Sequence, residues 1–172
     1  MAKKDALRDL QNRLALRMQQ AREEKRATAW LAVDVAGQGL LFPLQQAGEI
    51  FDADGILPVP HTRAWFAGVA NLRGGLHGVV DFAAFLGLRP HEAARDGAHL
   101  IALNPNLGLN CALLVDRLAG LRQRDELEPL AATPGPLPAF AGARWRDTQG
   151  RTWQEIELAA LAADGQFLAI AG

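Results

Sequence analysis

The sequence predicts a mainly β protein made of two small barrels behind an N-terminal helix. Three observations favour this fold class. The 172-residue chain contains 17 Gly and 9 Pro, a turn-rich composition that favours many short strands over long helices. After residue 28 the spacing of apolar residues changes from the helical period to a period of two. A similar order of elements then occurs twice along the chain, which indicates an internal duplication.

Residues 5–26 are predicted to form one helix. Five apolar residues recur there at steps of three and four and therefore share one narrow stripe: Leu7, Leu10, Leu14, Met18 and Ala21. Charged residues cover much of the remaining surface. Three interpretations stay open at this point: a helix packed on its own domain, a helix that grips a partner, and a frayed, mostly solvated tail.

The first barrel is expected at about residues 29–88. Leu31, Val33 and Val35 alternate with smaller or polar residues, as a half-buried strand requires. Each proline at positions 58 and 60 fixes its own φ and favours an extended connection. In order, the predicted elements are a hairpin with strands at 31–35 and 40–42, a third strand ending at 51, the extended segment 57–60, a helical turn at 65–68, strands at 69–72 and 77–82, and a short helix at 83–88.

The polar segment 89–97 is the expected boundary, and the second barrel is expected at about residues 98–172. Residues 140–143 (Phe-Ala-Gly-Ala) repeat the pattern of residues 66–69 (Phe-Ala-Gly-Val), and residues 157–161 repeat that of residues 81–85. In order, the predicted elements are strands at 99–103 and 109–115, a continuation at 118–122, a proline-rich loop at 128–138, and after it a strand pair and a short helix.

The sequence contains few of the residue patterns that enzymatic catalysis requires. Cys111, the single cysteine, lies in an apolar strand and is expected to be buried and inert. The four histidines match no metal-ligand spacing, and the glycines form no phosphate-binding loop. We therefore expect no metal, no cofactor and no enzymatic activity.

Charge and hydropathy limit the partners. The net charge of −1 provides no electrostatic footprint for nucleic acid or for an anionic membrane. No apolar run approaches the ~20 residues of a membrane-spanning helix, and the basic N-terminus does not lead into the apolar run of a signal peptide. A cytoplasmic location is the expectation.

Three polar residues at strand ends are candidates for function. Asp81 and Asp116 each end an apolar strand, where a carboxylate caps the next turn or accepts backbone N–H groups, and where a general acid–base role is the alternative. Arg73 lies in the polar turn 71–75, which contains two glycines that let another chain approach closely. Its guanidinium either pins the turn to its own barrel, through Glu49 or a backbone carbonyl, or contacts a partner protein.

Several segments resemble the core signature of the CheW family of chemotaxis coupling proteins. The matching stretches are Glu49-Ile50, Leu57-Pro58-Val59-Pro60, Gly68-Val69-Ala70-Asn71-Leu72-Arg73-Gly74, Val79-Val80-Asp81-Phe82, and residues 108–116, which end in Leu-Leu-Val-Asp. The resemblance covers about residues 29–161. The helical extension 1–28 and the ending 165–171 look closer to the branch found in type IV pilus (twitching motility) systems. The chain departs from the family pattern at His77-Gly78, where a proline is common, and at Phe82, where leucine is usual.

The resemblance implies a fold and a function. The fold is two five-stranded SH3-like barrels, here a CheW-like domain at residues 29–172. The implied function is that of a non-enzymatic adaptor in a chemosensory array, which couples methyl-accepting chemoreceptors to a histidine kinase. The groove between the barrels is implied to take the receptor's cytoplasmic helical tip, at positions that match Ala47, Glu49, Asn71 and Arg73 here.

The second implied partner is the kinase's own CheW-like regulatory domain. No nucleic acid and no direct membrane insertion are expected. The competing hypothesis is a small-ligand-binding or enzymatic double β-barrel protein with its site between the barrels. A deep closed pocket with convergent polar groups would favour that alternative.

Overall fold

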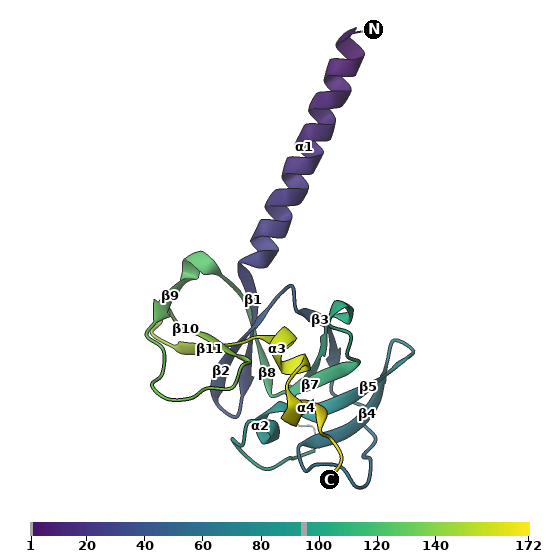
Figure 1. Cartoon of the computed structure of the whole chain (residues 1–172), viewed down its shortest axis with the longest axis vertical. Coiled ribbons are helices and arrows are strands. Elements are labelled where there is room, and N and C mark those ends of the chain that lie inside the picture. The colour runs from purple at the N-terminus through teal and green to yellow at the C-terminus, as the bar shows by residue number, and fades with distance from the viewer. Residues whose placement is uncertain (1, 94–95) are drawn as a thin grey trace.

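The structure is a computed structural model that describes residues 2–93 and 96–172 (Figure 1). Residues 94 and 95 of the expected boundary segment lie outside the described residues. The helices are α1 (Ala2–Ala27), α2 (Phe82–Phe85), α3 (Leu158–Ala162) and α4 (Gly165–Leu168), with 3₁₀ turns η1 (Pro105–Leu107) and η2 (Arg124–Glu126). The strands are β1 (Ala29–Val35), β2 (Gln38–Pro43), β3 (Ala47–Asp52), β4 (Phe66–Leu72), β5 (Gly75–Asp81), β6 (His99–Leu103), β7 (Cys111–Val115), β8 (Arg117–Gln123), β9 (Leu127–Leu130), β10 (Ala141–Asp147) and β11 (Thr152–Ile156).

The strands form two mixed sheets. One has six strands in the order β8-β1-β2-β11-β10-β9, and the other has five in the order β3-β6-β7-β5-β4. Neighbours are antiparallel except for two parallel pairs, β2 with β11 and β5 with β7. Within the described residues neither sheet closes through backbone hydrogen bonds, because the edge strands are not paired with each other. The mainly β fold with an N-terminal helix is confirmed.

Each sheet contains strands from both halves of the chain, which corrects the expected division at residues 89–98. The hairpin β1–β2 joins β8 and β11 from the second half, and the hairpin β6–β7 joins β3 and β5 from the first. The two halves therefore exchange hairpins reciprocally. Alternating apolar residues define which face of a strand is buried but do not specify its neighbour, so the local pattern could not reveal this exchange.

The duplicated elements adopt matching local structures. In each half a strand pair leads into a short helix, as β4–β5–α2 and as β10–β11–α3. Similar backbone hydrogen bonds tie the pairs together, with acceptors one residue apart in the repeat: Asp81 N–H donates to Trp65 O at 2.9 Å, and Glu157 N–H donates to Phe140 O at 2.8 Å. The repeated pattern read from the sequence therefore corresponds to a repeated supersecondary unit.

Some local expectations were wrong. Residues 66–68 belong to strand β4 and not to a helical turn, because Phe66 pairs with Val80 of β5. The predicted loop 128–138 begins inside β9, where Pro129 pairs with Trp145. Proline is tolerated there because β9 is an edge strand, which can lack one N–H donor. Helix α4 was not predicted; the Asp164 carboxylate caps it by accepting the N–H groups of Gln166 and Phe167.

The largest core lies between the two sheets. It combines side chains of β1 and β2 with side chains of β5, β6 and β7, and the short helices cover it. Phe82, which replaces the usual leucine of the family pattern, is fully buried and meets Phe42 edge to face with ring centroids 5.9 Å apart. Each sheet also has a smaller apolar cluster of its own, one built mainly from the five-stranded sheet and one from the six-stranded sheet. Because both halves contribute to the shared core, we expect them to fold together.

Helix α1 projects from the body and meets it at the start of β1 (Figure 1). The predicted helix at 5–26 is thus confirmed and extends slightly at both ends. Thr28 marks the junction: its N–H donates to Glu24 O, and its own carbonyl accepts the N–H of Arg124 at 3.0 Å. The chain is therefore attached to the body at Thr28, after the end of the helix, and this attachment does not depend on residues 1–26.

Deletion of residues 1–26 is expected to leave a cooperatively folded protein whose free energy of unfolding changes by less than about 1 kcal/mol. The deletion keeps Thr28 and all strands. Denaturant unfolding of the truncated and full-length chains, followed by tryptophan fluorescence, tests this. Loss of the cooperative transition would show instead that α1 is part of the core.

Candidate functional site

The four residues expected to contact a partner come from β3, β4 and the turn that follows β4. Ala47 and Glu49 lie on β3, Asn71 on β4, and Arg73 in the turn to β5. Strands β3 and β4 are the two opposite edges of the five-stranded sheet. The sheet nevertheless curls far enough for Arg73 Nη2 to approach Glu49 Oε1 at 2.6 Å. This ion pair bridges the two edges that backbone hydrogen bonds leave open.

The turn holds Arg73 in an unusual conformation. Arg73 and Gly74 both have positive φ, +51° and +79°, and they connect paired residues Leu72 and Gly75, as in a type I′ hairpin turn. The Asn71 carboxamide oxygen accepts the Gly74 N–H at 2.8 Å and fixes the turn. A left-handed conformation at a non-glycine residue costs about 1–2 kcal/mol. Placing an arginine at the tip of the β4–β5 hairpin therefore costs backbone strain.

The ion pair is exposed to solvent, and it leaves N–H donors of the Arg73 guanidinium available for another contact. The Arg73 side chain is 76% exposed and that of Glu49 43%, so the pair contributes at most about 1 kcal/mol to stability. A guanidinium has five N–H donors in a planar fork, more than one carboxylate contact uses. Arg73 can thus bind a second acceptor while it stays beside Glu49.

Exposed apolar residues lie close to the ion pair in the strand register. Ile50 follows Glu49 on β3 and is exposed, and Leu76 of β5, 65% exposed, pairs with Asn71 across the β4–β5 hairpin. We call the group Glu49, Ile50, Asn71, Arg73 and Leu76 the edge surface. Ala47 does not belong to it, because its side chain is buried in the core between the sheets.

The two strand-end carboxylates serve structural roles. Asp81 Oδ1 accepts the Ala84 N–H at 3.3 Å and caps α2, and Asp116 Oδ2 accepts the Ala36 N–H at 2.7 Å. This confirms that both carboxylates accept backbone N–H groups, as the capping interpretation predicts.

Two basic residues that sequence reasoning missed bind the same carboxylates. His91 Nδ1 lies 2.7 Å from Asp81 Oδ2, and Arg89 contacts both oxygens of Asp116 at 2.8 and 2.5 Å. Together these contacts fasten the segment after α2 across the strand ends. The available signal was the presence of two basic residues in this polar segment, which follows the first of the two strand-end carboxylates in the sequence.

Two further carboxylates have shifted pKa values without forming a catalytic set. Burial raises the pKa of Glu155, whose Oε2 accepts the Trp145 indole N–H at 3.3 Å. Partial burial raises the pKa of Asp147, but hydrogen bonds from the Trp153 indole and from backbone N–H groups outweigh it and lower the pKa. These contacts tie carboxylates to the tryptophans of the six-stranded sheet and position no nucleophile.

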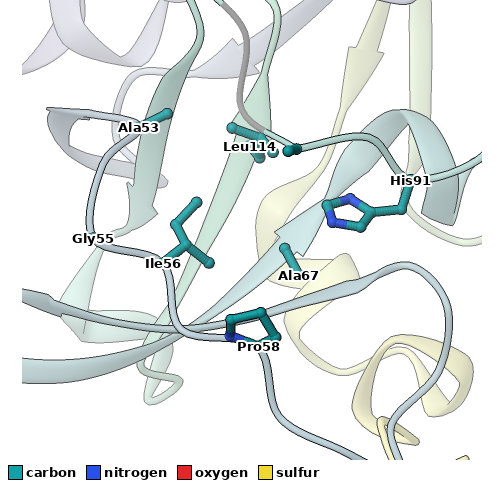
Figure 2. Close-up of a pocket in the computed structure, with 8 residues that line it drawn as sticks. Ala53, Gly55, Ile56, Pro58, Ala67, His91 and Leu114 are labelled. Atoms are coloured by element: carbon teal, nitrogen blue, oxygen red, sulfur yellow. The ribbon is translucent and has the colours of Figure 1, made fainter.

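The cavities are small or open. One of about 250 Å³ is lined largely by apolar residues that include Ile56, Pro58, Ala67 and Leu114, with His91 at its side (Figure 2). His91 is already bonded to Asp81. An open groove of about 500 Å³ runs along Leu40, Leu86, Phe140 and Ile156, with Arg144 at its rim. Neither is a deep pocket with convergent polar groups, the feature that would favour a small ligand.

Metal binding and membrane spanning are not supported by the described part of the chain. Among residues 2–93 and 96–172, no three His, Cys, Asp or Glu side chains gather where they could hold a metal ion. In the same residues, no helix is both long enough and apolar enough to cross a membrane. Cys111 is buried as expected, and burial raises the pKa of its thiol to about 12.

Comparison with known proteins agrees with the resemblance seen in the sequence. The family model described as "CheW-like domain" matches residues 29–166. Protein PilI of Pseudomonas aeruginosa is 25% identical over 165 residues, which cover 92% of this chain and 89% of PilI. The crystal structure of the scaffolding protein TtCheW from Thermoanaerobacter tengcongensis aligns with a TM-score of 0.67 at 18% identity, over 84% of this chain and 99% of that one. The expected similarity to a PilI-type, CheW-like protein is confirmed, and its SH3-like fold fits the two curled sheets.

Gly68→Ala is expected to cost about 3 kcal/mol or more. Gly68 has a φ of +139°, and a Cβ built there would lie 2.0 Å from the Leu57 carbonyl oxygen, where residues 57 and 69 form a two-bond bridge. Gly74→Ala is the matched control, because Gly74 has a positive φ but no atom within 4 Å of its Cβ position. That variant should lose only about 1–2 kcal/mol. Equal losses in denaturant unfolding would contradict the steric argument.

Cys111 is expected to resist thiol reagents in the folded protein. With a pKa of about 12 and a side chain 5% exposed, the reactive thiolate is both scarce and inaccessible at pH 8. Titration with a chromogenic disulfide should detect almost no thiol in buffer and one per chain in denaturant. Rapid reaction of the native chain would show that β7 is accessible.

Proposed function

The chain belongs to the CheW-like domain family, and on that premise we propose that it is a non-enzymatic adaptor that couples methyl-accepting chemoreceptors to a histidine kinase in a chemosensory array. The observation that carries this proposal is the edge surface. It presents a strained, exposed arginine with donors to spare beside exposed apolar side chains. Such a surface suits a protein partner better than a small substrate.

The receptor's cytoplasmic helical tip is the proposed ligand of the edge surface. A helix that docks there would bury Ile50 and Leu76 and offer Arg73 a carboxylate or a carbonyl oxygen. Glu49 and Asn71 would hold the arginine and its turn in place. Ala47, which was expected to contact the partner, would act only by supporting β3 from the core.

The kinase's CheW-like regulatory domain is the proposed second partner, on another part of the barrel surface. We place the array in the cytoplasm, where receptor tips lie. We assign it to type IV pilus twitching motility, because the N-terminal extension and the C-terminal segment resemble that branch and because PilI matches over 92% of the chain. The competing ligand-binding or enzymatic function gains no support from the cavities described above.

Arg73→Glu is expected to weaken binding of a receptor tip about a hundredfold, a loss of about 3 kcal/mol. Its free energy of unfolding should fall by no more than about 1 kcal/mol, because the ion pair with Glu49 is exposed. The probe is a purified helical-hairpin tip fragment of a methyl-accepting receptor from the source organism, with binding measured by calorimetry and stability by denaturant unfolding.

The double variant Glu49→Arg/Arg73→Glu is the control. It restores an ion pair of reversed polarity, so stability should recover while binding stays lost. Recovery of binding in the double variant would mean that Arg73 acts by closing the sheet edges and not by touching the receptor. Wild-type binding by Arg73→Glu would rule out the edge surface as the receptor site.

A further inference from the structure

Helix α1 carries an apolar seam that the body of the protein does not cover. Leu7, Leu10, Leu14 and Met18 are each at least 50% exposed, and the helix projects away from both sheets (Figure 1). The structure therefore does not show the helix packed on its own domain, which was one interpretation of its sequence. A partner for the seam has to come from elsewhere.

The seam is narrow. At 100° per residue, Leu7, Leu10, Leu14, Met18 and Ala21 fall within an arc of about 80°. An arc of this width matches the contact strip between two helices, whereas a helix that covers a globular core or lies in a membrane surface shows a wider apolar face. The seam thus has the dimensions for one partner helix.

The charges of α1 are segregated around the seam. By helical spacing, Lys4 and Arg22 border one side, and Arg13 and Arg17 border the other. Three of the four carboxylates of the helix lie on the opposite face: Asp5, Asp9 and Glu23. Residues 2–27 contain eight basic and four acidic residues, a net charge of +4, whereas the rest of the chain contains ten basic and fifteen acidic residues, a net charge of −5.

We propose that α1 binds an acidic amphipathic helix of a partner protein. The apolar seam of that helix would pack on Leu7, Leu10, Leu14 and Met18, and its flanking carboxylates would pair with Lys4, Arg13, Arg17 and Arg22. This contact is separate from the edge surface and gives the protein a second docking element, displaced from the barrels by a helix about 39 Å long.

Two other occupants fit the charges less well. In an antiparallel pair of α1 helices the same flank meets itself, so Arg13 and Arg17 would face their own copies, and in either orientation each helix carries +4. An anionic membrane would accept the basic flanks. However, α1 contains no aromatic residue and its apolar arc is narrow, both unlike interfacial helices.

The test uses the full chain and two labelled synthetic peptides of four heptads with Leu at positions a and d. One peptide carries Glu at positions e and g, and the other carries Lys there. Fluorescence anisotropy should show the full chain binding the Glu peptide at least tenfold more tightly than the Lys peptide, with an affinity that falls as salt rises.

Leu14→Glu should reduce binding of the Glu peptide at least tenfold, whereas Leu16→Glu should leave it within twofold. The pair is matched: both are Leu→Glu changes at similarly exposed positions, 50% and 59%, but Leu16 lies on the face opposite the seam. Circular dichroism of both variants checks that α1 stays helical. Arg13→Glu/Arg17→Glu should also weaken binding at least tenfold.

Three outcomes would overturn the proposal. The first is equal affinity for the Glu and Lys peptides, or equal effects of the Leu14 and Leu16 variants. The second is a concentration-dependent dimer in sedimentation that Leu14→Glu abolishes, which would make a second copy the occupant. The third is tighter binding to phosphatidylglycerol vesicles than to the Glu peptide. Arg73→Glu should leave peptide binding unchanged, so this result and the receptor-binding result can be distinguished.

Discussion

Strand pairs between the two halves hold the molecule together: the antiparallel pairs β1–β8 and β3–β6, and two parallel pairs. β2 pairs with β11, and β5 pairs with β7, so that each pair joins a hairpin of one half of the chain to the last strand of the other half. Neither sheet can form from one half alone, and the core between the sheets takes side chains from both. Because these contacts connect residues far apart in sequence, their formation carries a high loop-closure cost that only the complete core offsets. The result is one folding unit from two copies of a small motif.

The exchange leaves each sheet with two edge strands, and arginine side chains reach across each sheet in a different way. In the five-stranded sheet, Arg73 reaches from the β4–β5 turn to Glu49 on β3. In the six-stranded sheet, Arg122 of β8 lies over the Trp153 ring at 5.2 Å, and Arg124 of η2 lies over the Trp145 ring at 4.5 Å. Open edges invite pairing with other chains, and charged side chains at such edges limit it.

The arginine contacts of the two sheets differ in exposure, and the candidate site lies at the exposed one. The tryptophan rings that meet Arg122 and Arg124 are buried, so these two arginine contacts belong to the interior of the six-stranded sheet. The Glu49–Arg73 pair is exposed and contributes little to stability, so it is free to exchange partners. Asp81 and Asp116, in turn, hold the segment after α2 against the strand ends through His91 and Arg89. This exposed ion pair, on a turn fixed by the Asn71–Gly74 hydrogen bond, is the contact through which we propose that a helical partner is recognised.

The sequence by itself determined the local elements, because their causes are local. The spacing of Leu7 to Ala21 is enough for α1, alternating apolar residues for β1, and the turn residues Arg73-Gly74 for the β4–β5 hairpin. The repeated pattern also predicted the duplicated strand pair and helix, and the position of Cys111 in an apolar strand predicted its burial. Family resemblance then pointed to the residues around Arg73.

Only the tertiary structure decided which strands became neighbours. An alternation of apolar residues indicates which face of a strand is buried, but it is the same for every possible neighbouring strand. The hairpin exchange and the buried position of Ala47 were therefore not encoded locally. Glu49 was one of the alternatives for holding Arg73, and the tertiary structure selected it. Nor were the contacts of Arg89 and His91 encoded locally, because their carboxylate partners lie 27 and 10 residues away. Such contacts depend on how two sheets share one core, and that is a property of the whole chain.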